Sequence, residues 1–217
     1  MRPINDMMAD AFVADPGERA AVRQTPWRLA VVVFDGALMA TTTFGFGVFD
    51  IAAQYDALPG LDVRIVAGEP DVTMNGGGLS CPVPYDLDAV RTADLVIVPY
   101  LLQPTAERPP EPLLDALRAA HARGARLAGL CNGAFVLAAA GLLDDRPATT
   151  HWATAARLAE LYPKVRVDAT VLYIDDGDLL TAGGGVAGMD LGMHLIRSRR
   201  GAAVANRLAR ALVVAPH

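Results

Sequence analysis

Residues 129–135 read GLCNGAF and decide the fold of this 217-residue chain. The apolar run ARLAGL comes before the cysteine, and VLAAAGLL follows it. An apolar run that meets small residues and then resumes is typical of a buried strand turning directly into a helix. Gly129 and Gly133, two residues either side of Cys131, match the small-residue pattern of a nucleophile elbow with cysteine in place of serine. We therefore expect Cys131 at a sharp strand-to-helix turn.

Apolar runs followed by helical segments also occur before and after this turn. Apolar strands alternate with amphipathic helices, which predicts an α/β fold with a doubly wound, mostly parallel sheet covered by helices on both faces. The strand at 62–68 alternates polar and apolar residues, as a strand near a sheet edge does, and 74–87 reads as loops or a small hairpin. Strands are expected at 28–34, 62–68, 94–99 and 125–130, a hairpin at 171–183 turning at Asp176-Gly177, and helices at 44–57 (N-cap Thr43), 109–124, 132–140, 152–162, 185–198 and 202–212.

Composition narrows the class of protein. The net charge is −5 and the sequence pI is about 5.3, which argues against direct nucleic-acid binding by this chain. The basic cluster Arg197–Arg200 is interpreted as a solvated helix end. Two cysteines form no recognisable disulfide or metal motif, so we expect no metal and no cofactor. With neither a membrane span nor a secretory signal, a cytoplasmic location is expected. One domain is predicted at 27–217, after an N-terminal extension at 1–26.

The chemistry of the turn depends on its helix. A cysteine at a helix N-terminus commonly has a lowered pKa, which predicts a reactive thiolate at Cys131. The alternative is a buried, inert thiol. His151, in PATTHW, is the best candidate base, with a helix-capping histidine as the competing interpretation. His121 is placed on a surface helix and His194 on a Met-rich core stripe, where Met189 and Met193 pack. Trp27, Trp152 and Tyr100 are interpreted as core or rim residues.

Three blocks of the sequence resemble one family. GLCNGAFVLAAAGLLDDRPATTHW, VRVDATVLYIDDGDLLTAGGGVAGMDLGMHLI and GAAVANRLARALVVAPH are similar to the ThiJ/PfpI superfamily (class I glutamine amidotransferase-like proteins), and most of all to the N-terminal sensor domain of AraC-type transcription regulators. The resemblance spans about Trp27 to His217. It implies a flavodoxin-like sheet, a homodimer and Cys131 at the elbow. It also implies a DNA-binding helix-turn-helix domain downstream, absent from this chain.

The chain departs from the superfamily's enzymes at three places. The position of the carboxylate that lies beside the thiol in those enzymes is matched by Thr41, and Asn132 follows the cysteine where the protease branch has histidine. Tyr100-Leu101 replaces a glycine pair that helps form the oxyanion hole. General acid–base assistance is typically worth ~10²–10⁴-fold in rate, so these changes favour binding over catalysis.

Three functions remain open. The first is the ligand-sensing and dimerisation domain of an AraC-type regulator, with a small-molecule effector held by Cys131, Asn132, Thr41, Tyr100, Leu101 and His151. The second is a cysteine-dependent hydrolase or lyase, similar to isonitrile hydratase, in which Cys131 and His151 are catalytic. The third is a redox sensor in which Cys131 is oxidised. Cys81 is then either its resolving partner or only a small apolar residue of a loop.

Overall fold

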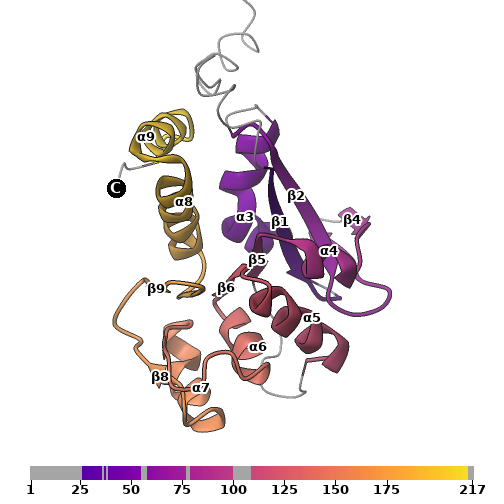
Figure 1. Cartoon of the computed structure of the whole chain (residues 1–217), viewed down its shortest axis with the longest axis vertical. Helices are drawn as coiled ribbons and strands as arrows, with labels where there is room; N and C mark the ends of the chain where they lie inside the picture. Colours follow the sequence, from indigo (N-terminus) through magenta and orange to yellow (C-terminus); the bar gives the residue numbers. More distant parts are fainter. Residues whose placement is uncertain are drawn as a thin grey trace, which may run out of the picture.

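A six-stranded sheet forms the centre of the molecule (Figure 1). The computed structural model describes residues 26–35, 37, 39–54, 58–76, 79–99 and 109–214, so the predicted extension up to residue 25, Tyr100 and Leu101 lie outside it. The strand order is β2-β1-β5-β6-β10-β9, and only the β9–β10 pair is antiparallel. The strands are β1 (Trp27–Val33), β2 (Leu61–Ala67), β5 (Leu95–Val98), β6 (Arg126–Leu130), β9 (Tyr173–Asp176) and β10 (Leu179–Ala182).

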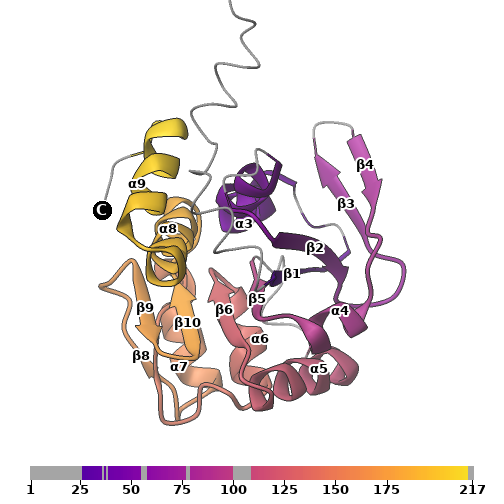
Figure 2. The same ribbon diagram turned by 45° about the horizontal axis from the view of Figure 1, so that its top comes forward.

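Helices cover both faces of the sheet (Figure 2). Successive side chains of a strand point to opposite faces, so Leu29 and Val31 of β1 pack in one core while Ala30 and Val32 pack in the other. On the first face lie α3 (Met39–Gln54), α8 (Val186–Arg200) and α9 (Ala202–Ala211); on the second lie α4 (Leu87–Thr92), α5 (Glu111–Ala122) and α6 (Gly133–Ala139). The predicted doubly wound, mostly parallel architecture is confirmed, with β2 at one edge.

Short elements complete the fold. The glycine-rich segment forms a hairpin of β3 (Thr73–Gly76) and β4 (Leu79–Pro82), and β7 (Pro147–Ala148) pairs with β8 (Arg166–Val167). The helix predicted at 152–162 is split into a 3₁₀ turn, η1 (Trp152–Thr154), and α7 (Ala155–Leu161). None of the helices in the described ranges combines the length and apolar character needed to cross a membrane.

The start of α3 corrects one prediction. The helix begins at Met39, so Thr43 lies inside it and is not its N-cap. The Thr43 hydroxyl donates a hydrogen bond of 2.7 Å to the Met39 carbonyl oxygen four residues earlier. A threonine that bonds back in this way is accommodated within a helix, which explains why the threonine run does not delay its start. Thr41 is therefore in the first turn of α3.

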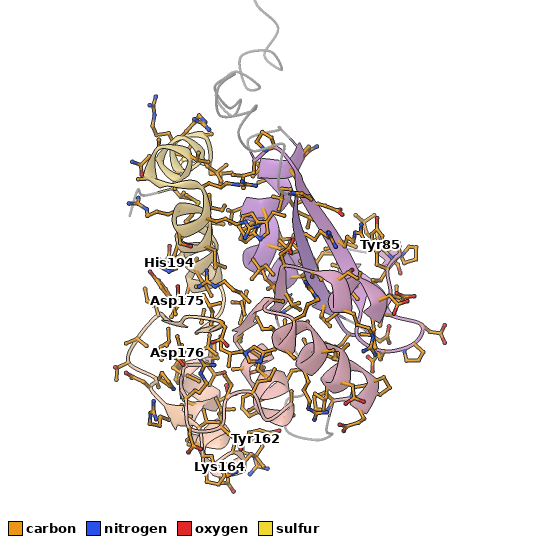
Figure 3. All side chains as sticks on the ribbon, in the orientation of Figure 1. Tyr85, Tyr162, Lys164, Asp175, Asp176 and His194 are labelled. Atoms are coloured by element: carbon orange, nitrogen blue, oxygen red, sulfur yellow. The ribbon has the colours of Figure 1, made fainter. Side chains whose placement is uncertain are left out.

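Charged contacts tie the β9–β10 hairpin to its neighbours. The His194 Nε2 atom lies 2.6 Å from the Asp175 Oδ2 atom, and the two side chains are seen together in Figure 3. Arg126 also binds Asp175, at 2.8 Å and 2.9 Å. The prediction that His194 lies on a core stripe was wrong, because it is a half-buried partner of the hairpin; Met193 is buried, and Met189 packs against the same core.

Candidate functional site

Cys131 lies between the last residue of β6 and the first residue of α6, at the carboxyl edge of the sheet. Its φ angle is 52°, in the left-handed region that residues other than glycine rarely adopt. Such strained positions persist only where the surrounding structure holds them, and they concentrate at functional sites. The backbone thus has the strand–turn–helix path expected of a residue presented at a sheet edge.

Two glycines make room for this path. A Cβ atom on Gly133 would lie 1.9 Å from the carbonyl oxygen of Val98, so α6 packs against β5 more closely than any side chain allows. A Cβ atom on Gly184 would lie 2.6 Å from the Cβ of Cys131 and 3.0 Å from its sulfur. Gly184 also has a φ angle of 92°. The cysteine side chain therefore rests directly against the backbone that follows β10.

Backbone groups of the cysteine are fully engaged. The N–H of Cys131 donates to the carbonyl oxygen of Ala182 at 2.8 Å. Its own carbonyl oxygen accepts a 2.7 Å hydrogen bond from the hydroxyl of Thr150, a residue that is almost completely buried. These bonds join three segments, β6, β10 and the loop after β7, at one point. They hold the strained turn in place.

The electrostatic environment of the thiol differs from the prediction. Burial raises the pKa of the Cys131 thiol above its ordinary value, and the opposing effect of the Asn132 backbone N–H is smaller. Removing a thiolate from water is costly, and one N–H at the start of a short helix does not offset that cost. The direction of this pKa shift favours the protonated thiol over the thiolate and is opposite to the direction that the helix N-terminus predicted.

His151 acts as a cap in this structure. Its Nδ1 atom accepts a 3.3 Å hydrogen bond from the backbone N–H of Ala153, at the N-cap of η1. In the neutral imidazole this leaves the proton on Nε2. No hydrogen bond joins His151 to the Cys131 sulfur among the described residues. Of the two interpretations that the sequence left open, the structure shows the capping one.

Asn132 is buried beside the thiol and is linked to the same turn. The hydroxyl of Thr154 lies 3.0 Å from the Oδ1 atom of Asn132 and 3.1 Å from the carbonyl oxygen of His151. A polar chain therefore runs from Asn132 through Thr154 to the backbone of His151. The structure brings Cys131, Asn132 and the His151 segment together as predicted by their sequence positions.

The remaining predicted site residues are only partly covered. Thr41 is in α3, but its side chain, like Tyr100 and Leu101, lies outside the described residues. Among the groups that the structure does describe, no carboxylate affects the pKa of Cys131, and no cluster of three or more His, Cys, Asp or Glu side chains could hold a metal ion. A thiol and neutral polar groups are thus what the described part of the site offers to a ligand.

Sequence reasoning missed several residues around the turn. Thr150 and Gly184 support Cys131 directly, and the signals were available in the TTH and GGG runs. Exposed apolar side chains also lie on these segments: Trp152 is 77% exposed, Leu172 65% and Val186 63%. The sequence left Trp27 and Trp152 as core or rim residues; Trp27 is buried in the core, whereas Trp152 is exposed. Its exposure follows from its place in η1, which turns it outward beside His151, with ring centroids 5.5 Å apart.

Comparisons with known proteins agree with this architecture. The transcriptional regulator CdhR of Pseudomonas aeruginosa is 31% identical over 70% of this chain and 44% of its own length. The isonitrile hydratase of Pseudomonas putida is 30% identical over 77% of this chain and 73% of its length. The crystal structure of an AraC family transcriptional regulator from Pseudomonas putida superposes with a TM-score of 0.72 at 27% identity, covering 86% of this chain and all of that one.

The chain spans different shares of the length of these relatives. The chain spans less than half the length of the first regulators that it matches. The family profile described as DJ-1/PfpI matches residues 28–198, which include all of the sheet except Trp27, the Cys131 turn and most of α8. The chain belongs to the DJ-1/PfpI family.

Proposed function

We propose that this chain is the ligand-sensing and dimerisation domain of an AraC-type transcription regulator and that it does not catalyse a reaction. The observation that carries the regulator assignment is the similarity of sequence and fold to such regulators. DNA would be contacted through a separate helix-turn-helix domain following residue 217, and the protein would act in the cytoplasm. The domain itself corresponds to 27–217, preceded by the extension 1–26.

The effector would bind at the carboxyl edge of the sheet, beside Cys131. Parallel α/β sheets bind ligands there, where the loops after the strands converge. Asn132, His151, Thr41, Tyr100 and Leu101 would complete the binding site. The described site residues Cys131, Asn132 and His151 include no carboxylate, lysine or arginine, and Trp152 offers an exposed aromatic face next to His151. A neutral or weakly polar small molecule fits such surroundings better than a highly charged one.

Absence of catalysis is supported by the state of the thiol. A nucleophilic cysteine reacts as thiolate, which needs a lowered pKa or a base in contact with the sulfur. Burial raises the pKa of Cys131, and His151 is hydrogen-bonded as a helix cap. Both observations favour recognition of a ligand over chemical conversion of it.

Calorimetry tests the effector site. A panel of amino acids, amines and other small metabolites is titrated into the purified domain, and hits are repeated with Cys131→Ala and Asn132→Ala. The full-length regulator is then assayed for operator binding with and without each hit. We expect a ligand whose binding is weakened by both substitutions and which changes operator affinity, since only differential affinity for two states shifts their populations. Ligand binding without any change in operator affinity would contradict the sensing role.

A second candidate is an enzyme similar to the isonitrile hydratase, because the match covers most of both chains. Such an enzyme adds water to the terminal carbon of an isonitrile and yields an N-substituted formamide. The assay incubates the protein with cyclohexyl isonitrile and measures formamide by mass spectrometry. Product formation that disappears in Cys131→Ala would replace the sensor proposal by this one.

A redox role is a weaker third candidate. Cys131 and Cys81 are both free, and Cys81 is exposed in the β3–β4 hairpin opposite Met74. A raised thiol pKa slows oxidation by peroxide, because the thiolate is the reacting form. Mass spectrometry after peroxide treatment would detect a sulfenic acid at Cys131 or a disulfide with Cys81.

The proposed dimerisation is tested by measuring the mass of the protein in solution. Trp152, Leu172 and Val186 are exposed apolar side chains, and groups of this kind mark interaction surfaces when they lie near one another. Light scattering after size-exclusion chromatography gives the mass in solution. We expect a dimer, and a monomeric mass across the tested concentrations would contradict this part of the proposal.

A further inference from the structure

A hollow lies at the amino edge of the sheet, opposite the Cys131 turn. It has a volume of about 540 Å³, within the range of small-molecule sites. It is formed where β1, β5 and β6 begin and where α5 and α8 end. The lining residues are Trp27, Asp94, Leu95, Arg123, Gly124, Ala125, Arg126, Leu195, Ser198 and Arg199. We call it the arginine hollow.

Positive charge dominates its lining. Its lining holds Arg123, Arg126 and Arg199 but one acid, Asp94, whose Oδ2 atom already accepts a 2.8 Å hydrogen bond from the backbone N–H of Arg28. Arg126 also pairs with Asp175, outside the lining, so Arg123 and Arg199 carry most of the uncompensated charge. This concentration of arginine contrasts with the net charge of −5 of the whole chain. Like charges brought together in a concave site create a field that attracts an anion.

Two of these arginines are held in fixed orientations. Arg126 donates from Nε to the Gly177 carbonyl oxygen and from Nη2 to Asp175, and Arg123 donates from Nε and Nη2 to the carbonyl oxygens of Arg91 and Ala93. In the described structure, the Nη1 atoms of both are left for another acceptor. An orientation fixed in advance lowers the entropy lost when a ligand binds.

Trp27 positions the other arginines. The guanidinium carbon of Arg199 lies 4.9 Å from the centroid of the buried Trp27 ring, and that of Arg200 lies 6.0 Å from it. Neither guanidinium forms an ion pair with any described residue, and the Nε and Nη2 atoms of Arg200 are buried without a hydrogen-bond partner. The interpretation of this cluster as a solvated helix end was therefore wrong for Arg200. Arg200 is half-buried, and taking part of its charge out of water without a partner is costly unless negative charge comes near it.

We propose that the arginine hollow binds a small phosphate-bearing anion. Phosphate oxygens accept hydrogen bonds from several guanidinium groups at once, and the planar fork of arginine matches their geometry. Arg199 and the Nη1 atoms of Arg123 and Arg126 would supply the donors, and Arg200 additional positive charge close by. The Ser198 hydroxyl is not counted among the donors, because it already donates to the Leu195 carbonyl oxygen at 3.0 Å. A concave hollow in an acidic chain fits a small molecule better than a nucleic-acid backbone, which needs an extended positive surface.

Fluorescence of Trp27 provides the test. The chain has two tryptophans, so Trp152→Phe leaves Trp27 as the reporter, at the cost of one exposed ring. Sodium pyrophosphate and inorganic phosphate are titrated at constant ionic strength into this variant. We expect a saturable change in Trp27 emission, with pyrophosphate binding more tightly than phosphate. Absence of a saturable change with either anion would overturn the proposal.

Paired substitutions distinguish binding at a specific site from attraction by the overall charge of the protein. Arg199→Gln is expected to weaken pyrophosphate binding by about tenfold or more, since it removes charge-assisted hydrogen bonds, and Arg199→Lys by less. Arg157→Gln removes the same charge from α7, where Arg157 pairs with Glu160, and is expected to leave binding unchanged. Equal weakening by Arg199→Gln and Arg157→Gln would show charge screening alone and would overturn the proposal. Urea unfolding of each variant confirms that it is folded.

Two further experiments test the location of the site and the kind of ligand. They also distinguish failure of this proposal from failure of the proposed function. Cys131→Ala is expected to leave pyrophosphate binding unchanged, because Cys131 lies at the opposite edge of the sheet; a loss of binding in this variant would contradict the location. A short DNA duplex that displaces pyrophosphate at lower phosphate concentration would overturn the assignment to a small anion.

Discussion

The side chain of Cys131 packs against the backbone of Gly184, where an added Cβ would lie 2.6 Å from the cysteine Cβ. Two residues with positive φ angles thus meet at the carboxyl edge of the sheet, one after β6 and one after β10. Each conformation constrains the other, because neither backbone can retreat without breaking the hydrogen bond between Cys131 and Ala182. The glycine is as necessary to the turn as the cysteine.

Gly184→Ala should be strongly destabilising. The substitution places a side chain in the left-handed region, at about 1–2 kcal/mol, and forces overpacking against Cys131, at about 1–3 kcal/mol. We expect a total loss of about 2–5 kcal/mol in the free energy of unfolding, measured by urea denaturation. Gly141→Ala is the control, because Gly141 also has a positive φ angle but nothing within 4 Å of an added Cβ. Equal losses in the two variants would show that the contact with Cys131 has no effect.

Thr150→Val should lower stability by removing the hydroxyl that binds the Cys131 carbonyl oxygen. The shape of the side chain is retained, so the loss reflects the hydrogen bond, at about 1–2 kcal/mol. The N–H of Ala134 also reaches this carbonyl, at 3.3 Å, which keeps the expected loss below that of a wholly unpaired group. Thr92→Val is the control, since its hydroxyl bonds within an exposed helix end. The measurement is again the urea midpoint, and no difference between the two variants would contradict the role of Thr150.

The alkylation rate of Cys131 should rise with pH, and the inflection of this rise should lie at a higher pH than that of an ordinary thiol. Burial raises its pKa, so the reactive thiolate forms only at higher pH than in a free cysteine. The experiment follows iodoacetamide labelling of Cys81→Ser by mass spectrometry between pH 6 and pH 10, with glutathione as reference. An inflection below that of glutathione would show a stabilised thiolate and would revive the enzymatic interpretation.

Asp178 should contribute to stability in a pH-dependent manner. Hydrogen bonds from Arg146 and His121 lower the pKa of its carboxyl group. A lowered pKa in the folded state contributes stability that is present above the unfolded value, about 3.9, and is lost as pH falls through the folded value. We expect the urea midpoint of the wild type to fall from pH 5 to pH 2 more than that of Asp178→Asn. Asp88→Asn, whose carboxylate is 89% exposed, should behave as the wild type.

Much of the fold was predictable because its signals are local. The strands β1, β5 and β6, the hairpin turning at Gly177 and the helix ending before Gly124 each follow from apolar runs and turn residues within a few positions. The edge position of β2 followed from its alternating pattern. The start of α3 could not be predicted, because helix propensities do not reveal the hydrogen bond from the Thr43 hydroxyl to the Met39 carbonyl oxygen.

The candidate site was less predictable, because its properties arise from contacts distant in sequence. The position of Cys131 at the turn could be inferred from Gly129 and Gly133. The direction of its pKa shift depends on burial produced by other strands, and this outweighs the helix N-terminus that the sequence suggested. The cap at His151 and the pairing of His194 with Asp175 likewise depend on distances that spacing alone does not give.

Helix α8 runs from the Cys131 turn at one edge of the sheet to the arginine hollow at the other edge. Its first residue, Val186, lies two positions after Gly184, which contacts Cys131, and Ser198 and Arg199 in its last turn line the arginine hollow. With 15 residues it is a rigid rod about 22 Å long. A ligand that displaces this rod along its axis at one end must move the other end as well. Occupancy at one edge of the sheet and affinity at the other would then be reciprocally linked.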